Sequence, residues 1–250
     1  NNDNIISKEM FVTGEFDLKK LRKSVNFLNK NYKTNALYDI GANIGVICIP
    51  AVKRGLVKKA YAVEPENKNF DLLKMNIAIN NLQDKINTYN YALSDQDDKK
   101  IEMELAEDNS GDHRIKSMIK FNTHGEEKRK TTEVFTKKFD TLFKNINPKT
   151  DLIWIDTQGY EPIILSGAKD LINSRAPIVL EFWPYALKRI GSWELMLKTI
   201  AQFDKYIDLS HETIELQEIS EKSLLKLQDG WGEEKKGSYS LYTDLLLLNN

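Results

Sequence analysis

The feature that most constrains the fold is a regular alternation of short apolar runs with helical periods between residues 36 and 93. The apolar runs are too short for helices and end near glycine, proline or an acid, so they predict buried strands. Strands are expected at 36–41, 59–65 and 86–93, and helices at 46–55 and 67–81. Right-handed crossovers between such strands predict a parallel sheet that is covered by helices on both faces.

The same alternation returns in the second half of the chain, after a polar middle. Strands are expected at 151–156 and 177–183, helices at 161–174 and 193–203, and a last strand in "GSYSLYTDLLLLNN". The middle, from about residue 95 to 135, carries polar turns and short alternating runs, which predict antiparallel hairpins. The chain therefore predicts a doubly wound α/β sheet with an antiparallel hairpin excursion in the middle.

An amphipathic helix is expected before the first strand. Leu18, Leu21, Val25 and Leu28 recur at helical spacing with lysines between them, so this helix should lie on the rest of the fold. We therefore expect residues 1–35 to form an N-terminal helical segment packed on a domain that comprises residues 36–250. A length of 250 residues fits one large α/β domain, and no repeat or flexible linker divides it.

Composition narrows the class of protein. The chain has 36 basic and 37 acidic side chains and a formal net charge of −1. This balance argues against a protein whose main function is to bind nucleic acid. Cys48 is the single cysteine, so an intrachain disulfide and a cysteine metal cluster are excluded. No apolar stretch approaches the roughly 20 residues of a membrane span, and the N-terminus shows no signal-peptide pattern. We expect a cytoplasmic protein, and its oligomeric state stays open.

Four of the expected strands carry an acid at or near their ends, namely Asp39, Glu64, Asp156 and Glu181. In open parallel sheets, ligands bind outside the carboxyl ends of the strands. One acid in such a place could be chance or a helix cap. Four acids at one edge of a sheet predict that they line a shared ligand-binding crevice.

The first strand is followed by a glycine turn, in which Gly41 and Gly45 permit backbone conformations that other residues avoid. A dinucleotide site of the Rossmann type would have further glycines at positions 43 and 46, where this chain has Asn43 and Val46. Those glycines help to bring the backbone against a pyrophosphate, which S-adenosylmethionine lacks. The turn therefore favours S-adenosylmethionine, whose methionine end suits a looser loop.

Two of the acids fit the rest of such a ligand. Asp39 can meet the ammonium of the methionine end, together with backbone carbonyls. Glu64 lies 23 positions after Gly41 and can accept hydrogen bonds from both ribose hydroxyls. NAD and S-adenosylmethionine share that ribose, so Glu64 supports either ligand, and a helix-capping role before Pro65 is the alternative.

The segments "DIGANIGVICIP", "AVEPENKNFDLLKMNIAIN", "NYALSD", "WIDTQGYEPIILSGAK" and "PIVLEFWP" follow one another between about residues 36 and 184. Together they resemble the FkbM family of S-adenosylmethionine-dependent methyltransferases. The resemblance implies a class I methyltransferase (Rossmann-like) sheet of seven strands with its last strand antiparallel. It also implies O-methylation of a hydroxyl group on a sugar, a glycan or a secondary metabolite.

The resemblance assigns roles to residues of this chain. The methionine end would lie against the glycine turn, Glu64 would hold the ribose, residues 92–94 would line the adenine, and Asp156 would lie beside the reactive methyl. Many members have Glu where this chain has Gln158, which weakens position 158 as a base or a metal ligand. The implied cofactor-binding set is Asp39, Gly41, Ala42, Asn43, Gly45, Glu64, Pro65, Ala92, Leu93, Ser94 and Asp156.

A hydroxyl acceptor calls for a general base, because a neutral alcohol is a poor nucleophile. Asp156 is the first candidate, since it closes a buried strand before a turn that contains glycine. Capping a helix and binding the cofactor's ammonium are equally open roles for it. Glu181 is the second candidate. His113, in the polar loop "NSGDHRI", is the third, because histidine titrates near neutral pH, although an exposed loop histidine is its simpler interpretation.

We predict no metal site. Asp156, Glu161 and Glu181 could offer carboxylates to a hard cation. No recognisable ligand spacing supports such a site, and Glu161 fits the acidic first turn of a helix beside Pro162.

Two other functions stay open. A NAD-dependent oxidoreductase is disfavoured by the absence of glycine at positions 43 and 46. A catalytically inactive methyltransferase fold that serves as a binding module is disfavoured by the presence of the glycines, Glu64 and Asp156. The predicted partner is a small-molecule or glycan hydroxyl acceptor, and the sequence does not choose among such acceptors.

Overall fold

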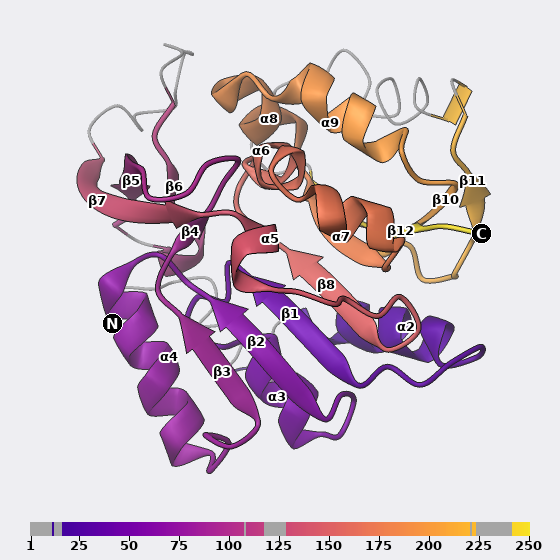
Figure 1. Cartoon of the computed structure of the whole chain (residues 1–250), viewed down its shortest axis with the longest axis horizontal. Helices are drawn as coiled ribbons and strands as arrows, with labels where there is room; N and C mark the ends of the chain where they lie inside the picture. Colours follow the sequence, from indigo (N-terminus) through magenta and orange to yellow (C-terminus); the bar gives the residue numbers. More distant parts are fainter. Residues whose placement is uncertain (1–11, 13–16, 108, 118–128, 221, 224–241) are drawn as a thin grey trace.

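The computed structural model describes residues 12, 17–107, 109–117, 129–220, 222–223 and 242–250 of the chain. Its main feature is an eight-stranded sheet in the order β11-β10-β12-β9-β8-β1-β2-β3 (Figure 1). The strands are β1 (Ala36–Ile40), β2 (Lys59–Val63), β3 (Ile86–Tyr89), β8 (Asp151–Ile155), β9 (Ile178–Phe182), β10 (Lys205–Asp208), β11 (Gln217–Glu218) and β12 (Thr243–Leu248).

The central strands run parallel, as the alternation of strands and helices predicts. β1 pairs in parallel with β2 and β8, and the parallel order continues to β3 on one side and β9 on the other. β12 inserts between β9 and β10 and is antiparallel to both. The implied count of seven strands is wrong, because the two-residue strand β11 adds an antiparallel edge beyond β10.

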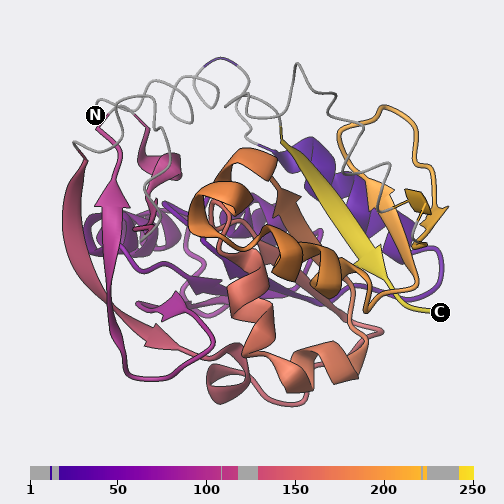
Figure 2. The same ribbon diagram turned by 90° about the horizontal axis from the view of Figure 1, so that it is seen from above.

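Helices cover both faces of this sheet. On one face lie α2 (Leu18–Leu28), α3 (Cys48–Lys53) and α4 (Asn67–Ile79), and on the other α5 (Phe139–Leu142), α6 (Glu161–Ser166), α7 (Lys169–Ser174) and α9 (Trp193–Ile200). Successive side chains of β1 enter opposite cores: Leu37 packs with the first group of helices, and Tyr38 with the second. Figure 2, turned by 90°, shows the orange helices on the near side of the sheet.

The N-terminal helix α2 packs through the stripe that its sequence predicts. Leu18, Leu21, Val25 and Leu28 are all buried, and they join the core formed with α3 and the sheet. Full burial of such a side chain contributes about 1.5–3 kcal/mol, so the stripe holds α2 firmly against the sheet. The division of the chain at residue 35 stays a prediction, and residues 1–11 and 13–16 lie outside the described residues.

The polar middle of the chain forms a second sheet, in the order β4-β7-β5-β6. Its strands are β4 (Ala92–Leu93), β5 (Lys100–Leu105), β6 (Arg114–Ile115) and β7 (Lys130–Lys137), with the short 3-10 helix η1 (Ser110–Asp112) before β6. β5 is antiparallel to β6 and β7, whereas β4 is parallel to β7. In Figure 1 the arrowheads of β1, β2 and β3 point toward this second sheet.

The structure differs from the predicted elements in three places. The expected strand at 86–93 is split, because Asn90 turns aside and its side-chain amide donates to the carbonyls of Glu64 and Pro65 at 3.0 and 3.1 Å. The expected helix at 161–174 is interrupted where Gly167 packs against the Asp95 backbone. An unpredicted helix, α8 (Pro184–Ile190), follows β9 at once, with proline at its first position.

Candidate active site

A cavity of about 370 Å³ lies where the carboxyl ends of β1, β2, β8 and β9 face the second sheet. The four strand-end acids Asp39, Glu64, Asp156 and Glu181 all line it, so the structure brings together the residues that the sequence predicted to converge. Gly41, Asn43, Pro65, Ala92, Leu93 and His113 also line it. Ala42, Gly45 and Ser94 do not line it; the Ser94 hydroxyl is 3.1 Å from the hydroxyl of Tyr160, which does line the cavity.

The glycine turn after β1 is held in a conformation that requires its glycines. Gly41 has a φ of 88°, and a Cβ there would lie 1.9 Å from the backbone oxygen of Asp156. Asn43 also has a positive φ, of 50°. Its side-chain Oδ1 is buried and has no hydrogen-bond partner among the described residues. A buried acceptor of this kind is costly unless a donor reaches it, so it suits a ligand that carries N–H groups.

Glu64 fastens this turn to the end of β2. Its two carboxylate oxygens accept from the backbone N–H of Asn43 and of Glu66, each at 2.9 Å. Burial raises the pKa of Glu64 to about 7. Each oxygen keeps a second lone pair, so a ribose contact stays compatible with this arrangement, but the first task of Glu64 is to shape the loop.

Like Glu64, Asp39 both binds a backbone N–H group and faces the cavity. Its Oδ2 accepts at 3.0 Å from the backbone N–H of Cys48, the first residue of α3, and burial raises its pKa to about 6. Asp39 therefore satisfies the start of α3 while it faces the cavity. Cys48 is fully buried, as its apolar surroundings in the sequence predict, and burial raises the pKa of its thiol.

Asp156 and Glu181 form a carboxylate pair that Gln158 bridges. The Gln158 Nε2 donates to Asp156 Oδ1 at 2.8 Å and to Glu181 Oε2 at 3.3 Å. Burial, and then the charge of Asp244, raise the pKa of Asp156 to about 8. Burial, and then the charge of Asp156, raise the pKa of Glu181 well above its ordinary value. Neighbouring carboxyl groups with raised pKa values are typical of sites that move protons.

Glu161 organises the turn that presents Gln158. It is fully buried at the start of α6, and its Oε1 accepts from the backbone N–H groups of Thr157 and Gly159 at 2.7 and 3.2 Å. It also accepts from the Thr157 hydroxyl at 3.0 Å. The structure therefore places Glu161 at the first turn of the helix, as predicted, and adds a task that the sequence did not reveal.

Three charged residues at or beside this site were not predicted from the sequence: Asp17, Lys20 and Asp244. Asp244 on β12 pairs in register with Glu181 on β9. The Lys20 ammonium, from α2, lies 2.6 Å from Asp244 and 2.7 Å from Asp17. Asp17, Asp244 and Tyr242 line the cavity. The one sequence signal was Asp244 itself, an acid within the apolar run "LYTDLLLL".

His113 does not have the environment of a general base. Its Nδ1 accepts at 3.0 Å from the backbone N–H of Ala106. In the neutral imidazole the proton then lies on Nε2, so neither ring nitrogen is placed to take a proton from a substrate. The third catalytic prediction therefore lacks support from the geometry, because a local backbone contact engages the nitrogen that it needs.

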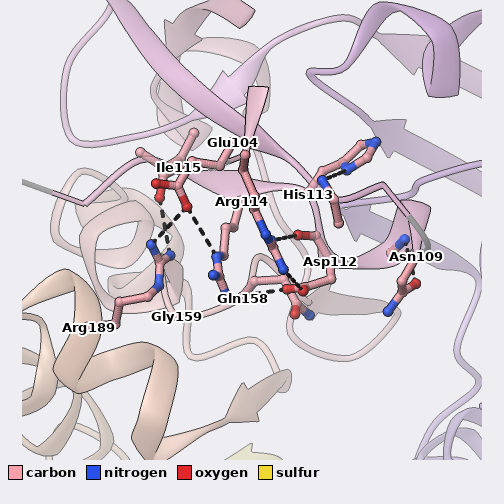
Figure 3. A network of polar contacts seen from close by, with 12 residues as sticks. Glu104, Asn109, Asp112, His113, Arg114, Ile115, Gln158, Gly159 and Arg189 are labelled. Atoms are coloured by element: carbon pink, nitrogen blue, oxygen red, sulfur yellow. Dashed lines mark hydrogen bonds and ion pairs between the residues drawn. The ribbon is translucent and has the colours of Figure 1, made fainter. Parts of the chain in front are cut away.

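The second sheet forms one wall of the cavity, and two arginines, Arg114 and Arg189, stabilise this wall. Arg114 is buried between Glu104 and Asp112, each contact being 3.4 Å long. Arg189, from α8, also reaches Glu104 and donates to the carbonyl of Ile115 (Figure 3). These contacts tie α8 to the second sheet. No group of three or more His, Cys, Asp or Glu residues suited to a metal ion occurs within the described residues.

The family model of the methyltransferase FkbM domain matches residues 39–212, which is well over half of the chain. The chain belongs to the FkbM methyltransferase family. The resemblance read from the sequence motifs is thereby confirmed. No curated protein matches the chain.

Three solved structures show a distant similarity to this FkbM-family chain. An FkbM methyltransferase from Methylobacillus flagellatus KT is 15% identical with a TM-score of 0.41. The alignment covers 66% of this chain and 36% of the chain in that structure. TrmK from M. capricolum, solved with S-adenosylhomocysteine, is 16% identical with a TM-score of 0.42, covering 90% and 66%. An rRNA methylase from Streptococcus thermophilus is 8% identical with a TM-score of 0.46, covering 92% and 97%. This chain thus spans about a third of the length of the first structure and about two thirds of the second.

No helix in the described part of the chain is long and apolar enough to cross a membrane.

Proposed function

We propose that this FkbM-family chain is an S-adenosylmethionine-dependent O-methyltransferase that methylates a hydroxyl group of a sugar, a glycan or a secondary metabolite. The observation that carries the proposal is the direct contact of two loops. Gly41 of the glycine turn packs against the backbone of Asp156, so that the cofactor loop and the best-placed carboxylate base share one cavity. The proposal also includes a cytoplasmic location and a small-molecule or glycan acceptor.

The residues of the cavity fit this cofactor. Asn43 offers a buried acceptor without a partner, and Asp39 offers a carboxylate, so both suit the ammonium of the methionine end. Glu64 suits the ribose hydroxyls, and Ala92 and Leu93 offer apolar surface to the adenine. When bound, S-adenosylmethionine supplies an electrophilic methyl group.

Asp156 performs the proton chemistry in this proposal. Its partly buried carboxylate would accept the proton of the acceptor hydroxyl, while the cofactor would supply the methyl group and its sulfur would keep the electron pair of the broken sulfur–carbon bond. A positioned base of this kind accelerates such a step by roughly 10²–10⁴-fold. Glu181, which is more deeply buried, sets the charge around Asp156 and is the second candidate for the base. Alignment of the two reactants within the cavity contributes up to about 7–11 kcal/mol.

Thermal unfolding with added ligands tests the cofactor. S-adenosylmethionine and S-adenosylhomocysteine should each raise the Tm, since ligand at 100 times its Kd adds about 2.7 kcal/mol of stability. NADH should leave the Tm unchanged. Glu64→Ala should abolish the shift because it releases the loop, whereas Glu133→Ala, on an exposed part of β7, should keep it. A shift with NADH alone would instead support the oxidoreductase alternative, and no shift with any ligand would support an inactive binding module.

Mass spectrometry of products tests the acceptor. With a methyl-labelled cofactor and panels of sugars, glycans and hydroxylated metabolites, we expect a label that withstands mild alkali, as an ether does. Loss of the label in alkali would indicate a methyl ester and would contradict the proposed hydroxyl acceptor. Asp156→Asn should lower turnover by roughly 10²–10⁴-fold while the cofactor still binds.

A further inference from the structure

The amide of Gln158 occupies an unusual position between two acids. Its Nε2 reaches both Asp156 and Glu181, and all three side chains line the cavity. An amide nitrogen carries two hydrogens and can therefore donate one to each carboxyl group. The bond to Asp156 is the shorter of the two, at 2.8 Å against 3.3 Å, and Asp156 is also the more exposed acid.

The backbone of Gln158 adopts a strained conformation in this position. Its φ is 59°, in the left-handed region that residues other than glycine rarely adopt. Glu161 fixes the flanking residues Thr157 and Gly159, and the Ser192 hydroxyl donates to the carbonyl of Gly159 at 2.9 Å. A strained residue persists where its surroundings over-determine it, and such residues cluster at functional sites.

The charged groups around the pair favour retention of a proton. Asp244 and Glu161 add negative charge to both acids, and Asp17 adds it to Asp156. Lys20 opposes this at Glu181, but its ammonium is ion-paired with Asp244 and Asp17. Two neighbouring carboxyl groups, one partly buried and one buried, do not ionise together readily, and they titrate as a unit.

We propose that Gln158 is a positioning residue that holds Asp156 and Glu181 as a proton-sharing pair, from which a cationic ligand in the cavity displaces a proton. This inference rests on the proposed function, because the sulfonium of S-adenosylmethionine is the expected cation. A positive charge near the pair favours the ionised form of Asp156, and the displaced proton passes to the solvent. The base would then be generated when the cofactor binds.

Isothermal titration calorimetry at neutral pH, in two buffers with different ionisation enthalpies, measures the protons released on binding. S-adenosylmethionine should release up to about one proton more than S-adenosylhomocysteine. Both ligands carry the same ammonium and ribose, so the difference isolates the sulfonium charge. Equal proton release by the two ligands would overturn the inference. Failure of both to bind would overturn the proposed function itself.

Variants test the role of the pair. Glu181→Gln removes the second carboxyl group, so Asp156 loses one like-charged neighbour and the difference in proton release should fall by at least half. Gln158→Leu removes the shared donor, so the pair should retain its proton and the difference should shrink by at least half. Gln202→Leu, at an exposed glutamine after α9, should behave as the unchanged protein does.

Circular dichroism checks that each variant is folded. If Gln158→Leu does not fold, Glu181→Gln alone tests whether Asp156 and Glu181 share a proton. A Glu181→Gln protein with the unchanged difference in proton release would show that the two acids do not share a proton.

Discussion

At the residue scale, Gly41 joins the two halves of the candidate site, because its missing side chain lets the first turn touch the backbone after β8. We predict that Gly41→Ala destabilises the protein by well over the 1–2 kcal/mol that a left-handed alanine costs. The added Cβ would lie 1.9 Å from the Asp156 oxygen, so that the turns after β1 and β8 must separate. Denaturant unfolding measures the loss, and weaker cofactor binding should accompany it.

Gly55 supplies the matched control for this substitution. It also has a positive φ, of 70°, but a Cβ there would meet nothing within 4 Å. Gly55→Ala should therefore cost only the backbone term of about 1–2 kcal/mol. Equal losses for the two variants would show that the contact between Gly41 and Asp156 does not matter for stability.

At the element scale, the turn between β8 and α6 depends on one buried carboxylate. We predict that Glu161→Ala destabilises the protein by about 1–3 kcal/mol for each donor left unsatisfied, because the N–H groups of Thr157 and Gly159 lose their acceptor. Gln158 should then relax from its strained conformation, so turnover should fall further than cofactor affinity. Unfolding curves, kcat and the cofactor Kd measure these effects.

An acid at the start of another helix tests whether the effect is specific. Glu194 lies in the first turn of α9 and is exposed. Glu194→Ala should change the free energy of unfolding by no more than about 0.5 kcal/mol. A comparable loss in both variants would mean that Glu161 acts through the helix dipole and not through the turn.

The elements differ in how far the sequence predicts them. Asp39, Glu64, Asp156 and Glu181 each end or nearly end an apolar run, so their meeting at one edge followed from the parallel order of the strands. The approach of Asp244 to Glu181 did not, because it depends on the long-range insertion of β12 beside β9. Periodicity within a segment cannot reveal a pairing between strands so far apart in sequence.

Side-chain roles were harder to predict than positions. Glu64 was expected to bind a ribose, and the structure shows that it first holds the backbone of Asn43. His113 was the third candidate for the general base, yet a local contact with the backbone N–H of Ala106 engages its Nδ1. Such hydrogen bonds depend on loop geometry at the ångström level, which neither composition nor spacing determines.

At the scale of the whole molecule, the fold concentrates buried carboxyl groups around one cavity, and this should govern its stability. Burial raises the pKa of each of these groups, to values of about 6 to about 8, from unfolded values near 4. The unfolded chain releases these protons near pH 4. Between about pH 4 and pH 8 the folded protein therefore binds protons that the unfolded chain has already lost. The groups are Asp39, Glu64, Asp156, Glu161 and Asp244.

The ligand-free protein should therefore lose stability as the pH rises from about 5 to about 8. Each proton that only the folded state holds costs about 1.4 kcal/mol per pH unit, and each kcal/mol lost lowers the Tm of a chain of this size by roughly 2–4 °C. Thermal unfolding across this range measures the slope. Asp156→Asn should flatten it most between pH 7 and 8, because the pKa of Asp156 lies at about 8. A Tm that rises over the same range would mean that these carboxyl groups are ionised in the folded protein, and that the cavity already supplies the stabilising charge that we assign to the cofactor.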